Sequence, residues 1–344
     1  MPDSTHHNLG GAGINRRHFL GMLTSLAIPS VAFGEQTAAE EEVNLIAIGD
    51  WGAAPDPGDP SDAPKVAALQ KRVADGVSRF VEENLKNSGK KLTAILALGD
   101  NFYGKLKGPD DPRFVERMEK LYPEAPMYFV LGNHDYEDHK RENWKHQIGW
   151  AARNPESRWK WPAAQDATWY TKQLPEASPL VSIIALDTNT DHVKDKWDDQ
   201  IKFLKAQMAS DTSPWRIVIA HHPMWTDGYH WDGKKDPGLY PKIRKTVLPE
   251  LSRAVFYVSA HDHNLQHIHH PDHPETEFFI SGSGGGDFAQ DRRSTTNRGY
   301  TNDFYKTYGF LYLNFTRKQA SAQLVEVQKD GKIQLLKEPS LKNA

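Results

Sequence analysis

Five short apolar runs of this 344-residue chain each end in a side chain that can bind a metal ion. Carboxylates, amides and imidazoles supply the oxygen and nitrogen atoms that protein metal sites use. Each run has the length of a strand, and the polar residue follows it at once. In chain order, the residues that end the runs are Asp50, Asp100, Asn133 with His134, His221, and His261 with His263. This pattern predicts a metal centre assembled from distant parts of the chain.

The number and spacing of these residues indicate two ions rather than one. Tyr103 follows Asp100 by three residues, so both side chains can reach one ion. His261 and His263 are two residues apart, and in an extended chain they would lie on the same face about 7 Å apart, which suits two neighbouring ions. The ligand candidates are too many for one tetrahedral centre: Asp50, Asp100, Tyr103, Asn133, His221, His261 and His263. We expect two metals that share one carboxylate.

Tyr103 bears on the charge of one ion. A phenol with a pKa near 10 becomes a ligand at mild pH only when a strong Lewis acid displaces its proton, so Tyr103 favours a trivalent ion. Taken singly, each candidate has a plainer interpretation. Asp50, Asp100 or Asn133 alone would be read as a turn residue or helix cap, and Tyr103 alone as a half-buried aromatic.

Alternating strands and helices must position these side chains. Apolar runs predict strands over 44–49, 94–99, 127–132, 215–220 and 255–260, and later over 310–315 and 324–327. Helical spacing of apolar residues predicts helices over 64–85, 201–208 and 243–251. Such a chain is typical of an α/β fold whose apolar strands are covered on both faces. Ligands in such sheets gather beyond the carboxyl ends of the strands, where all five motifs would lie.

Composition excludes several classes of protein. The chain has 42 Lys and Arg against 45 Asp and Glu, a net charge of −3, so no nucleic-acid partner is expected. Cysteine is absent, which excludes disulfides, thiolate nucleophiles, Cys-ligated zinc and iron–sulfur clusters. No GxSxG elbow is present, which weakens a Ser-His-Asp hydrolase. The 16 histidines permit a site of His and carboxylate ligands.

The first 34 residues are predicted to be a twin-arginine signal peptide. Arg16 and Arg17 precede an interrupted apolar stretch over 19–33, and residues 32–34 fit a small-x-small cleavage site. The stretch is too short to span a bilayer stably, since a span needs about 20 apolar residues, so no stable membrane anchor is expected. The mature protein would be periplasmic or secreted, with the twin-arginine export machinery as the partner of its precursor. The alternative is a buried N-terminal helix with two incidental arginines.

Five motifs resemble, in order, the five blocks of the metallophosphoesterase superfamily. They are GDWG (49–52), GDNFY (99–103), GNHD (132–135), AHHP (220–223) and AHDHNLQ (260–266). The tyrosine of GDNFY and the HDHNLQ run resemble the purple acid phosphatases of the small tartrate-resistant type, and the resemblance covers about residues 43–290. It implies that 35–344 is a single calcineurin-like catalytic domain. The implied fold is a four-layer sandwich of two packed mixed β-sheets flanked by helices.

The resemblance also implies a role for each candidate. Fe(III) would be one ion, and the second would be divalent Fe, Zn or Mn. The implied ligands are Asp50, Asp100, Tyr103 and His263 for Fe(III), and Asp100, Asn133, His221 and His261 for the second ion. His134 would contact the substrate phosphate and protonate the leaving group, and His230, nine residues after His221, would be a second substrate-pocket histidine.

The implied activity is that of an acid phosphatase. A metal-bound hydroxide would attack small phosphate monoesters at the dinuclear Fe(III)–M(II) centre. Two departures from the family pattern bear on the backbone: Ala220 and Ala260 stand where the family usually has glycine. If either position has a positive φ, an alanine there would be strained. Tartrate-resistant relatives from animals carry cysteines and a protease-cut loop, and that control cannot be transferred to a chain without cysteine.

Two other functions remain as alternatives. A phosphodiesterase or protein phosphatase of the same superfamily with two divalent ions is one, and Tyr103 argues against it. A non-catalytic exported protein that binds metal or phosphate is the other, and His134 and His230, which no metal requires, argue against that. Some residues have open roles, either beside the site or in ordinary structure: Asp135, Asn264, the glycine-rich run 281–286, Trp51, Trp225 and Trp231.

Overall fold

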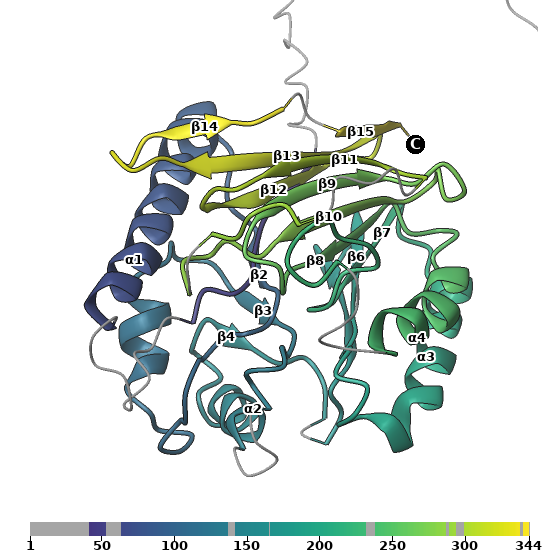
Figure 1. Ribbon diagram of the computed structural model, residues 1–344, viewed down its shortest axis with the longest axis horizontal. Helices are drawn as coiled ribbons and strands as arrows, with labels where there is room; N and C mark the ends of the chain where they lie inside the picture. Colours follow the sequence, from purple (N-terminus) through teal and green to yellow (C-terminus); the bar gives the residue numbers. More distant parts are fainter. Residues whose placement is uncertain are drawn as a thin grey trace, which may run out of the picture. The chain divides into compact units, whose positions relative to one another are not determined.

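The apolar runs form central strands of two β-sheets in the computed structural model of the chain (Figure 1). The structure describes residues 41–52, 63–136, 142–164, 166–231, 238–286, 289–293, 299–337 and 340–343. Glu40–Ala344 form one compact unit. The predicted signal peptide, 1–34, lies outside the described residues. Within the described ranges, every helix is too short or too polar to cross a membrane.

One sheet contains the first three motif strands. Its order is β14-β13-β12-β1-β2-β3-β4, and β15 also pairs with β13. Neighbours from β1 to β4 are parallel, whereas the pairs formed by β12, β13, β14 and β15 are antiparallel. The strands are β1 Val43–Ile48, β2 Ala94–Ala97, β3 Met127–Phe129, β4 Trp159–Lys160, β12 Gly309–Phe315, β13 Gln319–Val327, β14 Ile333–Leu335 and β15 Ser340–Asn343.

The other sheet contains the last two motif strands. Its order is β11-β9-β10-β8-β7-β6-β5. The central neighbours β10, β8, β7 and β6 are parallel, and both edges of the sheet are antiparallel. The strands are β5 Tyr170–Leu174, β6 Val181–Ala185, β7 Trp215–Ile219, β8 Phe256–Ser259, β9 Leu265–His269, β10 Glu277–Ser281 and β11 Thr301–Tyr305.

Alternating side chains of β1 show how the layers form. Leu45 and Ala47 pack in a core that lies between the two sheets. Ile46 and Ile48 face the other way and pack against Val77 of α1. The helices are α1 Ala63–Phe80, α2 Asn143–Arg153, α3 Trp197–Ser210 and α4 Leu239–Thr246. The first core therefore joins sheet to sheet, and the second joins a sheet to its covering helix.

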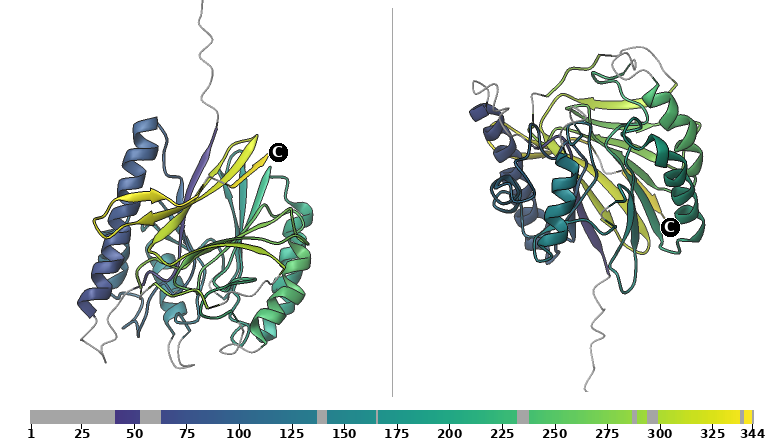
Figure 2. Two further views of the ribbon diagram at one scale, coloured as in Figure 1. Left: turned by 45° about the horizontal axis from the view of Figure 1, so that its top comes forward. Right: turned by 90° about the horizontal axis from the view of Figure 1, so that it is seen from below.

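The second sheet is covered in the same way on its own outer face. Leu204 of α3 and Ile243 of α4 share a core with Ile184 of β6 and Val218 of β7. The views of Figure 2 show α1 on one side and α3 with α4 on the other. This arrangement of helix, sheet, sheet and helix confirms the predicted fold class.

Two predicted helices differ in their ends. The helix expected over 64–85 ends at Phe80 and continues as a π-helical turn, Val81–Leu85. The helix expected over 243–251 begins earlier, and α4 ends at Thr246 before a short 3₁₀ turn, Leu248–Glu250. Pro249 lacks the backbone N–H that would extend α4. A second π-helical turn, Phe114–Glu119, precedes β3.

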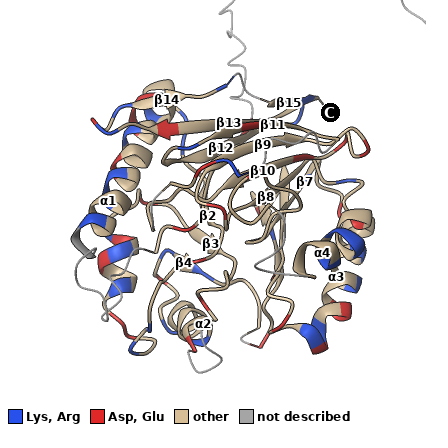
Figure 3. Cartoon of the chain, in the orientation of Figure 1, with Lys and Arg blue, Asp and Glu red and all other residues tan. Residues whose placement is uncertain are grey.

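Charged residues of both signs lie along α1 and α3, whereas α4 carries only Lys and Arg (Figure 3). Exposed pairs such as Lys71 with Asp75, at 2.7 Å, follow the i, i+4 spacing of a solvated helix face. The interspersed signs agree with the small net charge of the chain.

Candidate metal centre

Three of the predicted ligands lie in a backbone conformation that residues other than glycine rarely adopt. Asp50, Asp100 and His261 have φ values of 52°, 50° and 72°. Each follows the end of a buried strand, where the left-handed conformation turns the chain sharply. Such a conformation costs about 1–2 kcal/mol for a residue with a Cβ atom, and this strain tends to be stored at functional sites. Ala220 and Ala260 are absent from the described residues with positive φ, so their methyl groups cause no strain of this kind.

One group of ligand atoms converges on the phenol of Tyr103. Its oxygen lies 3.4 Å from Asp50 Oδ1, 3.4 Å from Asp100 Oδ2 and 3.4 Å from His263 Nε2. His263 Nε2 lies 3.5 Å from Asp50 Oδ1. The structure thus brings together the four side chains predicted for the trivalent ion.

A second group converges on His221. Its Nε2 atom lies 3.1 Å from Asn133 Oδ1 and 3.1 Å from His261 Nδ1. It also lies 3.5 Å from Asp100 Oδ2, the oxygen that approaches Tyr103. Asp100 therefore belongs to both groups, as expected for a carboxylate shared between two ions.

These distances fit metal coordination. Ligands about 2.1 Å from an ion lie about 3.4 Å apart in tetrahedral geometry and about 3.0 Å apart in octahedral geometry. The separations of 3.1–3.5 Å within both groups fall in this range. Ligand atoms of Asp50, Asp100 and His221 also lie within 4.8 Å of one another. The donor set, with carboxylates, a phenol, an amide and imidazoles, suits transition metals.

The electrostatics of the groups also favour bound cations. Burial raises the pKa of Asp50 because the carboxylate is removed from water. Burial acts in the same sense on Asp100, but the charges of His221 and His134 outweigh it and hold the pKa of Asp100 well below its usual range. Burial would lower the pKa of His221, yet Asp100 raises it to about 9. Without a metal, the charge of protonated His221 balances part of the negative charge of Asp100.

Further contacts orient the ligands. His221 Nδ1 lies 2.9 Å from the carbonyl oxygen of Leu98, which leaves Nε2 for the site. Asp50 Oδ2 accepts a hydrogen bond of 2.8 Å from the backbone N–H of His261. Asp100 Oδ1 accepts one of 2.9 Å from the backbone N–H of His134. Each aspartate thus keeps one oxygen in a backbone hydrogen bond and turns the other toward the site.

The two predicted substrate histidines lie beside these groups. The ring of His134 is 4.6 Å from that of Tyr103, and its Nε2 is 4.0 Å from Asp100 Oδ2. About a third of the His134 side chain, 34%, is exposed, so a substrate can reach it. The ring of His230 stacks on that of His261 at 4.0 Å. Both histidines therefore lie next to side chains of the two ligand groups.

The extended chain assumed for the last motif is not what the structure shows. Residues 261–264 form bends rather than an extended chain, and φ is positive at His261. The alternation of an extended strand therefore does not apply to these two histidines. The bend sends His261 toward His221 and His263 toward Tyr103, so each still reaches a different group.

Asp262 is a functional candidate that the motif analysis missed. Its Oδ1 accepts hydrogen bonds from His230 Nδ1 at 2.9 Å and from the His230 backbone N–H at 3.1 Å. Its Oδ2 accepts a hydrogen bond from the hydroxyl of Thr226. Asp262 is fully buried. In the sequence, the only indication of this role was the position of Asp262 between the two histidines of the last motif.

Asp135 braces the loops of the site rather than orienting a histidine. Its carboxylate accepts hydrogen bonds from the backbone N–H of Gly132 at 2.8 Å and of Asn101 at 3.2 Å. Burial, followed by the charge of Asp100, raises the pKa of Asp135 to about 7. Asn264 accepts a hydrogen bond of 2.7 Å from Gln266 of the following strand, β9.

The glycine-rich run 281–286 wraps the first aspartate. The backbone N–H of Gly286 donates to the carbonyl oxygen of Asp50 at 2.7 Å, and a Cβ at Gly282 would lie 2.7 Å from Asp50 Oδ2. A Cβ at Gly49 would lie 2.3 Å from that of Ala260. The run is a tight turn packed against the site. At Gly49, the absence of a Cβ atom leaves space for the methyl group of Ala260.

Two of the tryptophans with open roles now have clear surroundings. Trp51 is fully buried and packs edge-on against Tyr122 and Trp159, so it fills the core. Trp225 stacks on His270 at 4.3 Å. Neither contact involves a predicted ligand.

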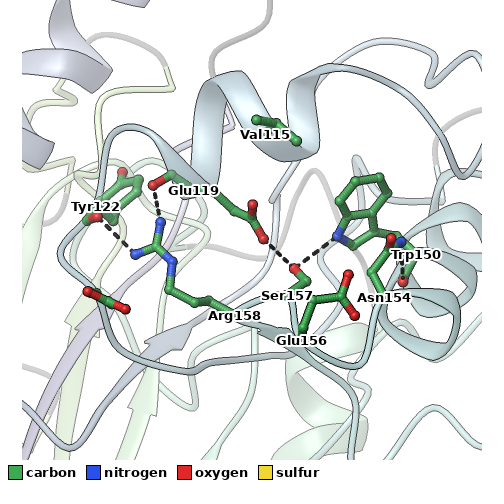
Figure 4. Close-up of a pocket in the computed structure, with 9 residues that line it drawn as sticks. Val115, Glu119, Tyr122, Trp150, Asn154, Glu156, Ser157 and Arg158 are labelled. Carbon is green, nitrogen blue, oxygen red and sulfur yellow. Dashed lines mark hydrogen bonds between the residues drawn. The ribbon is translucent and has the colours of Figure 1, made fainter.

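A pocket of about 550 Å³ lies apart from the candidate site (Figure 4). Arg158 donates to the carbonyl oxygens of Tyr122 and Glu119, and Ser157 bridges Glu119 and Trp150 through bonds of 2.5 and 3.1 Å. None of the predicted site residues lines it. These polar groups bond to one another, so we interpret them as structural contacts that hold the 114–119 turn in place.

The fold and the site define a class of protein, the metal-dependent phosphoesterases. The profile of the family described as Calcineurin-like phosphoesterase matches residues 43–265, which include every predicted site residue. The chain belongs to this family. Family and donor groups together support a metal-dependent hydrolase of phosphate esters with a centre for two ions.

The relatives are more particular and confirm the likeness to purple acid phosphatases. The chain is 26% identical over 333 residues to tartrate-resistant acid phosphatase type 5 of Homo sapiens, covering 89% of this chain and 92% of that protein. It is 26% identical over 317 residues to purple acid phosphatase 17 of Arabidopsis thaliana, covering 86% and 84%.

Solved structures show the same fold. The protein described as GAP50, the anchor in the inner membrane complex of Plasmodium, gives a TM-score of 0.64 at 21% identity, covering 86% of this chain and 88% of that one. Purple acid phosphatase PPD1 from yellow lupin (Lupinus luteus) seeds gives 0.60 at 14% identity, covering 88% of this chain and 54% of that one.

Proposed function

We propose that the protein is an acid phosphatase that hydrolyses small phosphate monoesters at a centre of Fe(III) and a divalent ion. The observation that carries the proposal is the position of the Tyr103 oxygen, 3.4 Å from one atom each of Asp50, Asp100 and His263. A phenolate ligand favours a trivalent ion, and two divalent ions would have little need of it. Relatives named as acid phosphatases support the same activity.

The residues divide into two ligand sets with Asp100 in common. When bound, the ions would supply Lewis acidity toward the phosphate oxygens and an activated water molecule. Asp50, Asp100 and a Tyr103 phenolate carry three negative charges, fewer than the five positive charges of the ions. The surplus positive charge attracts a phosphate ester and favours charge that develops in the transition state.

The protein's own acids act on the leaving group. His134 lies at the exposed side of the site and can hydrogen-bond the phosphate. His230, held by Asp262 through Nδ1, is left with Nε2 to donate a proton to the departing alkoxide or phenoxide. Proton donation matters most for poor leaving groups, so alkyl phosphates depend on these histidines more than nitrophenyl phosphates do.

The experiment that tests the proposal is a visible spectrum with metal analysis on freshly purified protein. We expect iron, a phenolate-to-iron absorption band, and loss of that band in Tyr103→Phe. Tyr170→Phe is the matched control, since its hydroxyl is buried against the carbonyl oxygen of Phe129 at 2.9 Å, away from the ligands. A protein that turns over phenyl phosphate with two divalent ions and no such band would refute the iron assignment.

We also propose that the precursor leaves the cytoplasm by the twin-arginine route. The support is the order of Arg16, Arg17, apolar stretch and cleavage site in the sequence. Replacing both arginines with lysine should keep the full-length precursor inside the cell. Unchanged recovery of the mature protein outside the cytoplasm would contradict this route.

A further inference from the structure

An arginine lies next to the loop that carries His230, and no carboxylate of the described residues neutralises it. Arg293 belongs to the short segment 289–293, and its exposed guanidinium lies over the ring of Tyr229, with Cζ 5.3 Å from the ring centroid. Among the residues that the structure describes, none forms an ion pair with it. An arginine stays charged at any ordinary pH, so Arg293 contributes a permanent positive charge there.

Two carboxylates of the described residues near Arg293 have other partners. Asp227 Oδ2 accepts hydrogen bonds from Arg292 Nη2 at 2.5 Å and Nε at 3.2 Å, and its Oδ1 accepts one from Tyr300 at 2.9 Å. Asp291 pairs with Lys306 at 2.9 Å. Neither of these two carboxylates therefore neutralises Arg293.

The position of Arg293 is fixed by its backbone. Its N–H donates to the carbonyl oxygen of Asp227 at 2.8 Å. Earlier in the segment, the N–H of Gln290 donates to the carbonyl oxygen of His263 at 2.7 Å. The backbone of the segment is thus tied at one end to a predicted ligand and at the other to the loop that carries His230.

Two ring contacts join Arg293 to the metal site. The rings of Tyr229 and His230 meet edge to face at 5.1 Å, and the ring of His230 stacks on that of His261 at 4.0 Å. Tyr229 and His230 are both half-buried, so this row of side chains, called the Tyr229 wall below, is partly open to solvent. A leaving group that extends from His230 along the Tyr229 wall would reach the guanidinium of Arg293.

We propose that Arg293 selects phosphate esters whose leaving group carries a second anionic group, a carboxylate or a phosphate. The inference rests on the proposed function, because it assigns the substrate class of that site. Arg293 would bind the distal anion through its planar fork of N–H donors, while the ester phosphate lies among the ligands. The metal centre would set the reaction, and Arg293 would set which esters are preferred.

The test uses pairs of ligands that differ only in distal charge. Phenyl phosphates carrying a para ω-carboxyalkyl chain of zero to three methylenes are each compared with the corresponding amide, which has a similar leaving group. For at least one chain length we expect kcat/KM to favour the carboxylate roughly two- to fivefold, the range of an exposed ion pair. The preference should shrink as salt increases.

Variants assign the preference to one side chain. Arg293→Gln should bring the carboxylate-to-amide ratio to about one, Arg293→Glu should invert it, and Arg293→Lys should restore part of it. Lys306→Gln is the matched control, since it removes an exposed cation of the neighbouring ion pair and should leave the ratio as in the parent. A parent ratio of one at every length, or a ratio that survives Arg293→Gln, overturns the inference.

A binding measurement separates this inference from the proposed function. The same carboxylate and amide pairs are prepared as non-hydrolysable phenylphosphonates, and their dissociation constants are measured on the metal-loaded protein. Tighter binding of the carboxylate that depends on Arg293 supports the inference even if no ester is turned over, in which case the phosphatase proposal fails alone. Turnover without any charge preference leaves the phosphatase proposal intact and refutes the role of Arg293.

Discussion

Replacing Asp262 with asparagine should impair proton donation by His230 while the metal site stays intact. The carboxylate accepts two hydrogen bonds from His230 on Oδ1 and one from the Thr226 hydroxyl on Oδ2. Asparagine has nearly the same shape, but one of its two ends is an N–H₂ donor. The hydroxyl oxygen of Thr226 already accepts hydrogen bonds from Gly228 and Gln266, each at 2.9 Å. The new amide would therefore face a group with little accepting capacity left.

The size of the effect follows from the lost bonds. A hydrogen bond to a charged group contributes about 1.5–3 kcal/mol. If that whole amount is lost from the transition state, kcat falls roughly 10- to 150-fold. The loss should be largest for alkyl phosphates, whose leaving groups need a proton, and smallest for nitrophenyl phosphate.

The assay is kcat for a series of leaving groups, with metal content measured in parallel. Asp303→Asn is the matched control, because it removes a carboxylate 3.6 Å from His267 Nδ1, in a network that contacts none of the predicted ligands. Equal dependence on the leaving group in the parent and in Asp262→Asn, at equal metal content, would refute the reasoning that Asp262 positions His230.

Two further predictions concern stability. Gly49→Ala should destabilise the protein by about 1–3 kcal/mol, because the new Cβ would lie 2.3 Å from that of Ala260. Thermal unfolding measures this loss, and adding Ala260→Gly to the same chain should recover most of it. A double variant as unstable as Gly49→Ala alone would show that this contact is not the cause. Burial raises the pKa of Glu277, but His267 and Lys342 outweigh it and lower the pKa to about 2. The charged form therefore stabilises the fold above pH 4.5, and this contribution is lost as the pH falls toward 2. Glu277→Gln should lower the free energy of unfolding in urea by about 1–3 kcal/mol at pH 7. The difference in this free energy between the parent and the variant should be smaller at pH 3. A difference that does not change with pH would contradict the lowered pKa of Glu277.

The sequence located the candidate site well because its signal is local. An apolar run followed at once by Asp50 or His221 marks the end of a buried strand, and the ends of parallel strands meet at one edge. The expectation of two packed sheets came from the family resemblance, which did not assign the motif strands to one sheet or the other. Nothing in a single run, such as the one before His221, indicates which sheet it will join.

What the sequence could not supply depends on contacts between distant residues. Asp262 became a candidate only when the fold placed its carboxylate on His230, 32 residues earlier in the chain. The bend at His261 was hidden in the same way, because alternation assumes an extended backbone. From the sequence we asked whether Ala260 has a strained, positive φ, but the positive φ belongs to the next residue, His261.

The left-handed, buried Asp50 suggests that the fold gives up stability to hold its ligands. Its side chain is fully buried, and this burial, together with the nearby charge of Asp100, raises the pKa of Asp50. Asparagine tolerates the same φ, can keep the hydrogen bond from the His261 N–H, and carries no charge to desolvate. Asp50→Asn should therefore stabilise the metal-free protein by about 1–3 kcal/mol and weaken the gain on adding metals.

Urea unfolding of chelated and metal-loaded protein measures both effects. Asp227→Asn is the control of opposite sign, because that buried carboxylate is paired with Arg292, so its neutralisation should destabilise the chelated and the loaded protein alike. If chelated Asp50→Asn unfolds at lower urea than chelated parent, Asp50 is stabilised by its protein neighbours alone. The metal would then be unnecessary to explain why a carboxylate lies buried in a strained turn at this position.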